Sequence, residues 1–481
     1  MAAWLTLLGL IGACGTTPQL PSATSPRLAH CQQIFADNDA RLRTAGIRDA
    51  QAWRVAGYPF LRVDRVLASF AAEANNAAQR AAWLARATAH DAEGRELEIA
   101  RLSPAPDSAL IDQLRSCRVA LSSALRDDDD AWHAMLNFSQ VADDYSVTRR
   151  VLGLYAVSAR VVLASVQRMQ KRAMPRLIDS SASNAVGGER YGLSADASNE
   201  TIAPGPAPWR HDALGIPLFT DAERAGLLRR HAPELSIETR SDDDRPGRIT
   251  RNTAPFVNRA EPVLYSQLTY TRFGDEVLPQ LVFTWWFAAH TAQGRFDALA
   301  GPLDGLSWRV TLAGDGQPLA YDLVHNCGCY HMFFPSARLR VRYQAKGLEE
   351  PPWVPFTIPT QWRGRLRLAL ASGTHYLTAL APASATPPAD GYVLRPYAEL
   401  RALPAHEQRS SLFDAHGLVP ASARGERWFL WPMGVVAPGS MRQWGHQATA
   451  FVGRRHFDEA RLLERYFERV DSAPPTQQRR P

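Results

Sequence analysis

The chain has 481 residues, of which 46% are hydrophobic, 21% charged and 9% aromatic. This composition excludes an intrinsically disordered protein, because disordered chains are polar and poor in aromatic residues. The length exceeds what one hydrophobic core usually organises, so we expect two folded domains. The net charge of +6 comes almost entirely from arginines spread along the chain. A spread charge lacks the clustered footprint that phosphate binding needs, which argues against nucleic acid as a partner.

The N-terminus carries a short apolar stretch, Leu5 to Ile11, followed by Gly12, Ala13 and Cys14. The stretch is too short to span a bilayer, which takes about 20 residues, and is typical of the apolar core of a signal peptide. The sequence from Ile11 to Cys14 resembles the lipobox of bacterial lipoproteins. This resemblance implies that residues 1–13 are removed and that Cys14 is lipidated. The mature protein would then be anchored to the lipid bilayer in the cell envelope, at the outer membrane, facing the periplasm or the cell surface.

Changes in residue periodicity divide the rest of the chain. Apolar residues at three- and four-residue spacing predict a helical domain over 27–172, after a lipidated spacer over 14–26. A segment dense in Ser, Ala, Gly and Pro predicts a linker over 173–217. Period-two patterns then predict a mainly antiparallel β-rich domain over 218–470, and residues 471–481 are expected to be a disordered tail. The fold class is therefore α+β.

Within the helical domain, Cys31 precedes Ile34 and Phe35, and Cys117 lies on an apolar helical stripe. Both cysteines are expected on buried helix faces in an oxidising compartment, so we predict a disulfide between them. Two separately buried free thiols are the alternative.

In the β-rich domain a short helix is predicted at Asp221 to Arg230, because Thr220 and Asp221 are suitable caps. Glycine and aspartate at 274–275 predict a hairpin between two apolar strands. A closing helix is predicted from Phe457 to Val470. Strands are expected at Leu264 to Phe273, Gln280 to Phe287, Trp308 to Leu312, His325 to Phe334, Arg338 to Tyr343, Arg363 to Leu370 and Ala448 to Val452.

The densest group of metal-ligating residue types is His325, Cys327, Cys329 and His331. In a straight strand all four side chains share one face, but the outer pair lie about 20 Å apart, too far for one ion. A turn at Gly328 would fold the segment into a His2Cys2 set suited to zinc or copper. Otherwise two neighbours would need a distant partner, for which the candidates are His290, His375, His416 and His446. A disulfide between the two cysteines, or ordinary turn and core residues, are the alternatives.

Two segments alternate arginine with mostly apolar residues. If these strands are neighbours, their arginines share one face that would bind an anionic partner in the envelope. The alternative is a solvent-facing sheet without a partner. The arginines are Arg338, Arg340 and Arg342 in the first segment and Arg363, Arg365 and Arg367 in the second.

None of the usual motifs of serine hydrolases, zinc proteases, nucleotide-binding proteins or dinucleotide-binding proteins occurs in the sequence. Three functions therefore remain open. The chain is a ligand-binding envelope lipoprotein, a metal-dependent hydrolase centred on His325 to His331, or a structural scaffold of the envelope. A pocket beside Cys327 that holds further histidines would favour the hydrolase, and a flat arginine surface would favour the scaffold.

Overall fold

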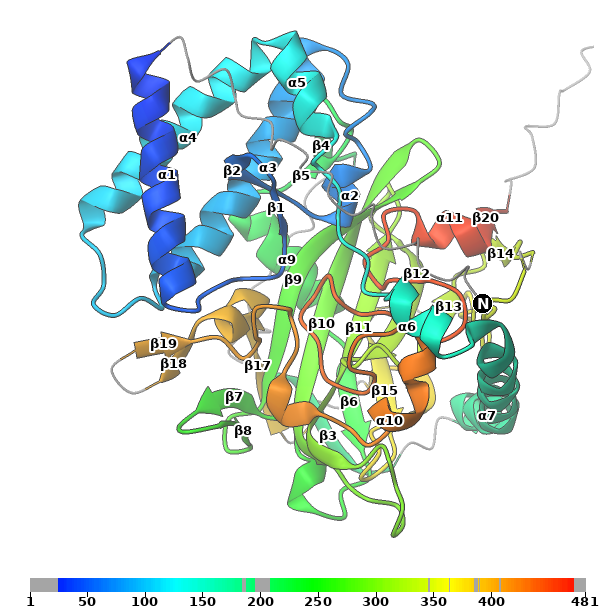
Figure 1. The fold of residues 1–481 in the computed structure, drawn as a ribbon. Coiled ribbons are helices and arrows are strands. Elements are labelled where there is room, and N and C mark those ends of the chain that lie inside the picture. Colours follow the sequence, from blue (N-terminus) through cyan, green and yellow to red (C-terminus); the bar gives the residue numbers. More distant parts are fainter. Residues whose placement is uncertain are drawn as a thin grey trace, which may run out of the picture.

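The computed structural model describes residues 25–183, 187–194, 208–344, 347–362, 364–384, 388, 390–405 and 408–470. A helical region comes first, and a large, mainly antiparallel sheet follows, so the predicted α+β class is confirmed (Figure 1). Cys14, Arg363 and the expected tail lie outside the described residues.

The N-terminal region is a layer of helices around a small hairpin. Its core contains Phe35, Trp83, Leu121 and Trp132, each at most 1% exposed. The hairpin was not predicted, and Gly57 makes its turn possible because the backbone there has φ +81°. The elements are α1 (Pro26–Thr44), β1 (Trp53–Val55), β2 (Tyr58–Val63), α2 (Arg65–Ala68), α3 (Ala77–Ile99), α4 (Ser108–Arg126) and α5 (Asp129–Leu136).

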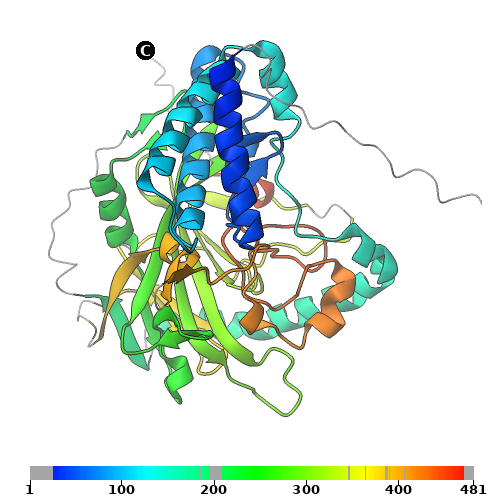
Figure 2. The same ribbon diagram turned by 60° about the vertical axis from the view of Figure 1, so that its left-hand side comes forward.

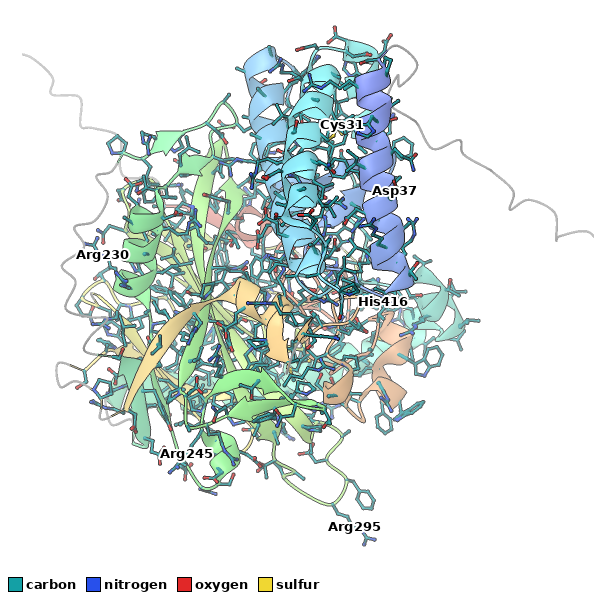
Figure 3. All side chains as sticks on the ribbon, turned by 90° about the vertical axis from the view of Figure 1, so that its left-hand side faces the viewer. Cys31, Asp37, Arg230, Arg245, Arg295 and His416 are labelled. Atoms are coloured by element: carbon teal, nitrogen blue, oxygen red, sulfur yellow. A yellow bond between two sulfur atoms is a disulfide. The ribbon has the colours of Figure 1, made fainter. Side chains whose placement is uncertain are left out.

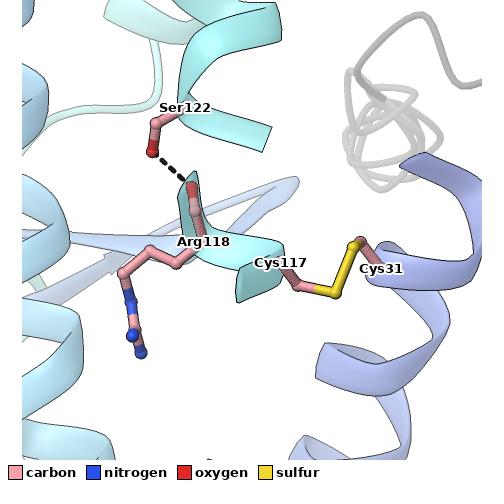
Figure 4. The surroundings of a disulfide bond; sticks show 4 residues. All are labelled: Cys31, Cys117, Arg118 and Ser122. Atoms are coloured by element: carbon pink, nitrogen blue, oxygen red, sulfur yellow. Dashed lines mark hydrogen bonds between the residues drawn. A yellow bond between two sulfur atoms is a disulfide. The ribbon is translucent and has the colours of Figure 1, made fainter. Parts of the chain in front are cut away.

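The predicted Cys31–Cys117 disulfide is present and joins α1 to α4 (Figure 4). The two Cα atoms lie 5.0 Å apart, and both cysteines are at most 5% exposed. Figure 3 shows Cys31 on α1 at one end of the molecule, with Arg295 at a loop tip at the opposite end. The disulfide therefore ties the helical layer together at a distance from that loop.

The segment expected to be a linker contains regular structure instead. Helix α7 (Tyr155–Ser183) passes through Pro175, and β3 (Glu189–Leu193) lies inside the main sheet. Leu177 and the neighbouring Met169 and Met174 pack against the core of that sheet, which explains why the helix continues beyond residue 172. The shorter elements nearby are α6 (Val147–Leu152), β4 (Arg210–His211) and β5 (Pro217–Leu218).

The main sheet has ten strands in the order β13-β12-β11-β10-β9-β17-β3-β6-β15-β16. The predicted hairpin at Gly274 is confirmed, since β9 and β10 pair antiparallel on either side of it. The strands are β13 (Met332–Pro335), β12 (Pro318–His325), β11 (Gly301–Leu312), β10 (Glu276–His290), β9 (Val263–Phe273), β17 (Asp390–Pro396), β6 (Glu234–Ile237), β15 (Leu366–Leu370) and β16 (Leu377–Pro382), with β3 as given above.

The predicted helix after Thr220 is confirmed as α9 (Asp221–His231), and Thr220 and Glu223 form a capping box at its start. Two other expectations are wrong. Residues 448–452 form no strand, and the closing helix is reduced to α11 (Leu462–Tyr466) followed by β20 (Phe467–Arg469). The apolar residues of this segment that pack against the sheet are Leu462, Leu463 and Tyr466 of α11 and Phe467 of β20.

Small elements complete the C-terminal region. Outside the main sheet, β4 pairs with β5, β7 with β8, β14 with β20 and β18 with β19. These elements are β7 (Arg248–Arg251), β8 (Pro255–Asn258), β14 (Leu339–Val341), β18 (Leu403–Ala405), β19 (Gln408–Ser410), α10 (Arg427–Leu430) and the 3-10 turns η2 (Asp242–Asp244), η3 (Tyr397–Arg401), η4 (Pro420–Ser422) and η5 (Trp431–Met433).

Candidate functional site

The segment from His325 to His331 is the turn between β12 and β13. The backbone N–H of His325 donates to the carbonyl of Cys329 at 2.9 Å, and Gly328 has φ +98°. A Cβ at Gly328 would lie 2.3 Å from the carbonyl oxygen of Ala448. Only glycine fits such a position, so the strand expected from His325 to Phe334 is interrupted here, and of the two conformations considered for this segment the structure has the turn at Gly328.

The turn does not bring the four ligand-type residues to one point. Both ring nitrogens of His331 are engaged, Nε2 with Asp322 Oδ2 at 2.8 Å and Nδ1 with Thr449 Oγ1 at 3.1 Å. Within the described ranges, no group of three or more His, Cys, Asp or Glu residues is arranged to hold a metal ion. The predicted His2Cys2 set is therefore not assembled, because His331 supports Asp322 instead.

A cavity of about 520 Å³ lies beside Cys327 and Cys329. Its lining includes buried polar groups, whereas helices α7 and α10 contribute mainly apolar side chains. The polar residues that matter for chemistry are His290, Asp304, His325, Tyr330, Tyr376 and Glu426.

Three neighbouring strands place an aspartate and two histidines at the same end of the sheet. Asp304 is near the start of β11, His290 ends β10 and His325 ends β12. The carboxylate of Asp304 lies 3.4 Å from Nδ1 of His290 and 4.0 Å from Nδ1 of His325. Since Nδ1 of His290 faces Asp304, its Nε2 is on the far side of the ring. This pair has the geometry by which a carboxylate orients a histidine base.

A third histidine, His375, supports Asp304 from the loop between β15 and β16. Its Nδ1 lies 2.7 Å from Asp304 Oδ2, and its ring stacks on Phe287. Burial would raise the pKa of Asp304, but hydrogen bonds from His290 and His375 hold that pKa well below its usual value. Asp304 is therefore a carboxylate at neutral pH, although it is only 1% exposed.

His325 is a buried histidine without a strong partner. It is 3% exposed, and its Nε2 forms no hydrogen bond with described residues. Burial lowers its pKa to about 4, so the ring is neutral at pH 7. The stacked rings of Tyr330 and Tyr376 lie 5.5 Å and 5.3 Å from the ring of His325. A neutral imidazole is thus held at the polar end of the cavity.

Glu426 is the second carboxyl group of the cavity and behaves differently from Asp304. Burial raises the pKa of Glu426 to about 7, against the opposing charges of Arg424 and Arg442. Gly439 leaves room for the carboxyl, since a Cβ there would lie 2.5 Å from Glu426 Oε1. A group that is partly protonated near pH 7 can serve as a general acid or base.

Cys329 faces the same carboxyl, and Cys327 contacts Cys329. Sγ of Cys329 lies 3.9 Å from Glu426 Oε1, and Sγ of Cys327 accepts the backbone N–H of Cys329 at 3.4 Å. A hydrogen bond with Cys327 and burial raise the pKa of Cys329 well above its usual value. Cys329 is therefore a thiol rather than a nucleophilic thiolate at neutral pH.

The backbone around the cavity is strained at several non-glycine residues. Leu303 next to Asp304, Tyr330 and His375 have φ between +53° and +59°. Arg424 holds the first of these by donating to the carbonyl of Leu303 at 2.5 Å. Such residues cost about 1–3 kcal/mol each and cluster at functional sites.

The two arginine segments are not neighbours. Strand β14, with Arg338, Arg340 and Arg342 in or beside it, pairs with β20, whereas β15 lies between β6 and β16 in the main sheet. Arg338 pairs with Asp315, Arg340 with Glu468, and Arg367 is buried near Glu234. The described arginines of the two segments therefore do not share one face. Arg365 directly precedes β15 and so lies with the second segment.

Of the histidines named as distant partners, His290 and His375 reach the site. His446 instead bonds to Asp144 and to the carbonyl of Ala50, and His416 is exposed. The sequence did not single out Asp304 or Glu426. No local pattern marks them, because strand pairing and a loop far along the chain bring them to the cavity.

No helix among the described residues is long and apolar enough to cross a membrane. In comparisons with known proteins, no family model, curated protein or solved structure matches the chain.

Proposed function

We propose that this protein is a hydrolase of the bacterial cell envelope that cleaves an acyl ester or a similar bond in the cavity beside Cys327. The proposal is carried by one observation. An ionised carboxylate with its histidine, Asp304 and His290, shares the cavity with Glu426, whose pKa is about 7. Two carboxyl groups whose environments move their pKa values apart are a pattern of acid–base catalysis.

In the proposed step, His290 removes a proton from a water molecule as the water oxygen attacks the acyl carbon. Asp304 holds the resulting imidazolium through Nδ1. Protonated Glu426 donates its proton to the leaving oxygen as the bond between that oxygen and the acyl carbon breaks. The products are a carboxylic acid and an alcohol, and the proton on His290 returns to Glu426 or to solvent. Neutral His325 is available as a hydrogen-bonding group for the substrate.

The same observation favours a hydrolase over a binding protein or a scaffold. General acid–base catalysis is most efficient when the pKa of the acting group lies near the working pH, which is where burial places the pKa of Glu426, whereas ligand binding does not call for such a match. The envelope location rests on the proposed lipidation of Cys14. Labelled palmitate should enter the full-length chain in a bacterial host, and Cys14→Ser should abolish labelling and leave the protein unanchored. Equal labelling of both chains would refute the lipoprotein assignment.

The probe for hydrolysis is ethyl octanoate, followed by the octanoate released, because its apolar chain suits the cavity and its alkoxide leaving group needs a proton. The rate should fall as the pH rises through about 7, because Glu426 loses the proton that it must donate. Glu426→Gln should lower the rate by about 10²–10⁴-fold and remove this limb of the pH profile. The control is Glu464→Gln on α11, outside the cavity, which should leave both unchanged. Equal rates for the parent and Glu426→Gln, or no hydrolysis of octanoyl and acetyl esters, would refute the hydrolase.

A metal-dependent hydrolase is the second candidate, favoured by the two neighbouring thiols at the cavity. Zinc or copper at Cys327 and Cys329 would give about one ion per chain in elemental analysis of the purified protein. The Cys327→Ser/Cys329→Ser variant would then lose both metal and activity. Activity that survives in this variant without metal favours acid–base chemistry by Glu426.

A further inference from the structure

Helices α6, α7 and α10 present large apolar side chains to solvent. We call this surface the apolar face, and each of its members is between 66% and 72% exposed. The helices lie side by side in both views of the molecule (Figures 1 and 2). Turn η5, which follows α10, contacts both α6 and α7. The members are Val151, Leu152, Leu154, Val157, Val161, Trp428 and Phe429.

Basic residues continue the apolar face along the outer side of α7. Val157 and Val161 lie one turn apart on α7, just after exposed Leu154, and the same side of the helix then carries exposed Arg168 and Arg172. Lys171 is exposed beside them. On α10, the guanidinium of Arg427 lies 4.9 Å from the ring of Trp428. Apolar and aromatic side chains next to exposed cations suit the interface of an anionic membrane.

The cavity opens within the apolar face. Val161 and Val162 of α7 line it on one side, and Phe429 and Leu430 of α10 line it on the other. Val161 and Phe429 thus belong both to the cavity and to the exposed surface. The apolar lining leads inward to the buried polar groups, so the surface and the candidate active site are continuous.

We propose that the apolar face docks on a membrane surface with anionic headgroups, and that the cavity takes up the acyl chain of a lipid from that surface. The choice of lipid as substrate rests on the proposed function, whereas docking does not. A lipid surface fits better than a protein partner, because the exposed residues stand on helices around a cavity mouth with cations beside them. Lipid would reach the polar end of the cavity without crossing water.

Docking is tested with the full-length Cys14→Ser chain, which carries no acyl anchor. The probes are phosphatidylcholine vesicles with and without phosphatidylglycerol, in a cosedimentation assay. Trp428→Ser/Val157→Asn changes two exposed residues that do not line the cavity. It should weaken binding about tenfold or more, because both side chains lose apolar area that the membrane would bury. Lys171→Glu/Arg172→Glu should abolish the preference for phosphatidylglycerol.

The matched control is Val119→Asn on α4, whose side chain is 66% exposed but lies in the helical region. It should bind vesicles like the parent. Equal binding by the parent and the Trp428→Ser/Val157→Asn variant, or no binding by the parent, would overturn the proposal. Self-association of the parent that the double substitution removes would assign the face to a second copy of the chain instead. Because the assay needs no turnover, docking can fail while hydrolysis stands, and hydrolysis can fail while docking stands.

Discussion

The helical region and the cavity both bury carboxyl groups, but the surroundings of Asp91 and Glu426 shift the pKa of these two groups in opposite directions. In the helical region Asp91 receives hydrogen bonds from Arg62, Arg95 and Arg118, and despite its burial these arginines hold its pKa near 2. At the cavity, burial raises the pKa of Glu426 to about 7, although Arg424 and Arg442 oppose it. The first arrangement favours the charged form and stabilises the fold, whereas the second leaves a group that can exchange a proton near neutral pH.

The backbone shows the same contrast. Among the described residues up to α6, only the glycines Gly46 and Gly57 have positive φ, whereas Leu303, Tyr330 and His375 do so around the cavity. The helical region thus relies on unstrained local structure and paired charges. The cavity keeps strained and weakly partnered groups, and the surrounding fold must hold them in place.

The largest effect is expected from breaking the charge network of the helical region. Arg62 is fully buried between Asp91 and Glu98, so Arg62→Met removes one buried cation from both carboxylates and leaves Asp91 with Arg95 and Arg118, and Glu98 with Arg54. The free energy of unfolding should fall by about 3–5 kcal/mol in urea denaturation. The control is Arg115→Ala, whose exposed ion pair with Asp112 should contribute less than about 1 kcal/mol. Equal losses in the two variants would show that burial does not distinguish the pairs.

The disulfide of the helical region is expected to contribute next. Cys31 and Cys117 are 86 residues apart, and Cys31→Ser/Cys117→Ser should lower the free energy of unfolding by about 2–5 kcal/mol. Mass spectrometry of non-reduced protein should show the cross-linked peptides. Cys327→Ser/Cys329→Ser is the matched control, because these thiols are free and the variant should respond to reductant like the parent. Free thiols at 31 and 117 in the purified protein would contradict the prediction.

The contact between the helical region and the C-terminal chain should depend on pH. Burial lowers the pKa of His456, but hydrogen bonds to Asp143, Asp144 and Glu459 outweigh this effect and raise it to about 10. A histidine whose pKa is higher in the folded protein than in the unfolded chain stabilises the folded state. This contribution is complete at pH values below the pKa of the unfolded chain, about 6.5. This contribution should be lost as the pH rises from there through about 10.

Substitution of His456 checks this sign. The melting temperature of the parent should fall from about pH 7 to pH 10, and that of His456→Gln should start lower and fall less. The surface variant His416→Gln serves as the control, since His416 is exposed, and it should follow the parent curve. A parent melting temperature that rises over this range would contradict the assignment of the proton to His456.

The smallest effect on stability is expected at the cavity. His325→Leu removes a buried Nε2 without a hydrogen-bond partner among the described residues, and leucine is apolar and similar in size. The free energy of unfolding should therefore change by no more than about 1 kcal/mol. Hydrolysis of ethyl octanoate should nevertheless decrease strongly, because His325 is the hydrogen-bonding group proposed for the substrate. A loss of stability as large as in Arg62→Met would remove the contrast between the two regions.

Much of the fold could be predicted from local patterns. The α+β class, the α9 helix with its Thr220 cap, the hairpin at Gly274 and the Cys31–Cys117 pair all follow from residues that act within a few positions or on one helix face. Local pattern left the segment around Gly328 open between a strand and a turn, and the structure has the turn, in which glycine takes a positive φ. Errors arose where tertiary packing replaced local preference, as in the short α11 and in α7, which continues through Pro175.

By itself, the sequence determined the α+β class, the capped start of α9, the hairpin between β9 and β10 and which cysteines can pair, because periodicity and capping are local properties. Only the tertiary structure decided what surrounds the turn at 325–331. It separated His331 from His325, since Asp322 and Thr449 occupy both nitrogens of His331. It also placed Asp304 and Glu426 in one cavity. Their sequence positions are over 100 residues apart, and the pKa of each depends on burial and on partners that pairing of distant strands and loops supplies.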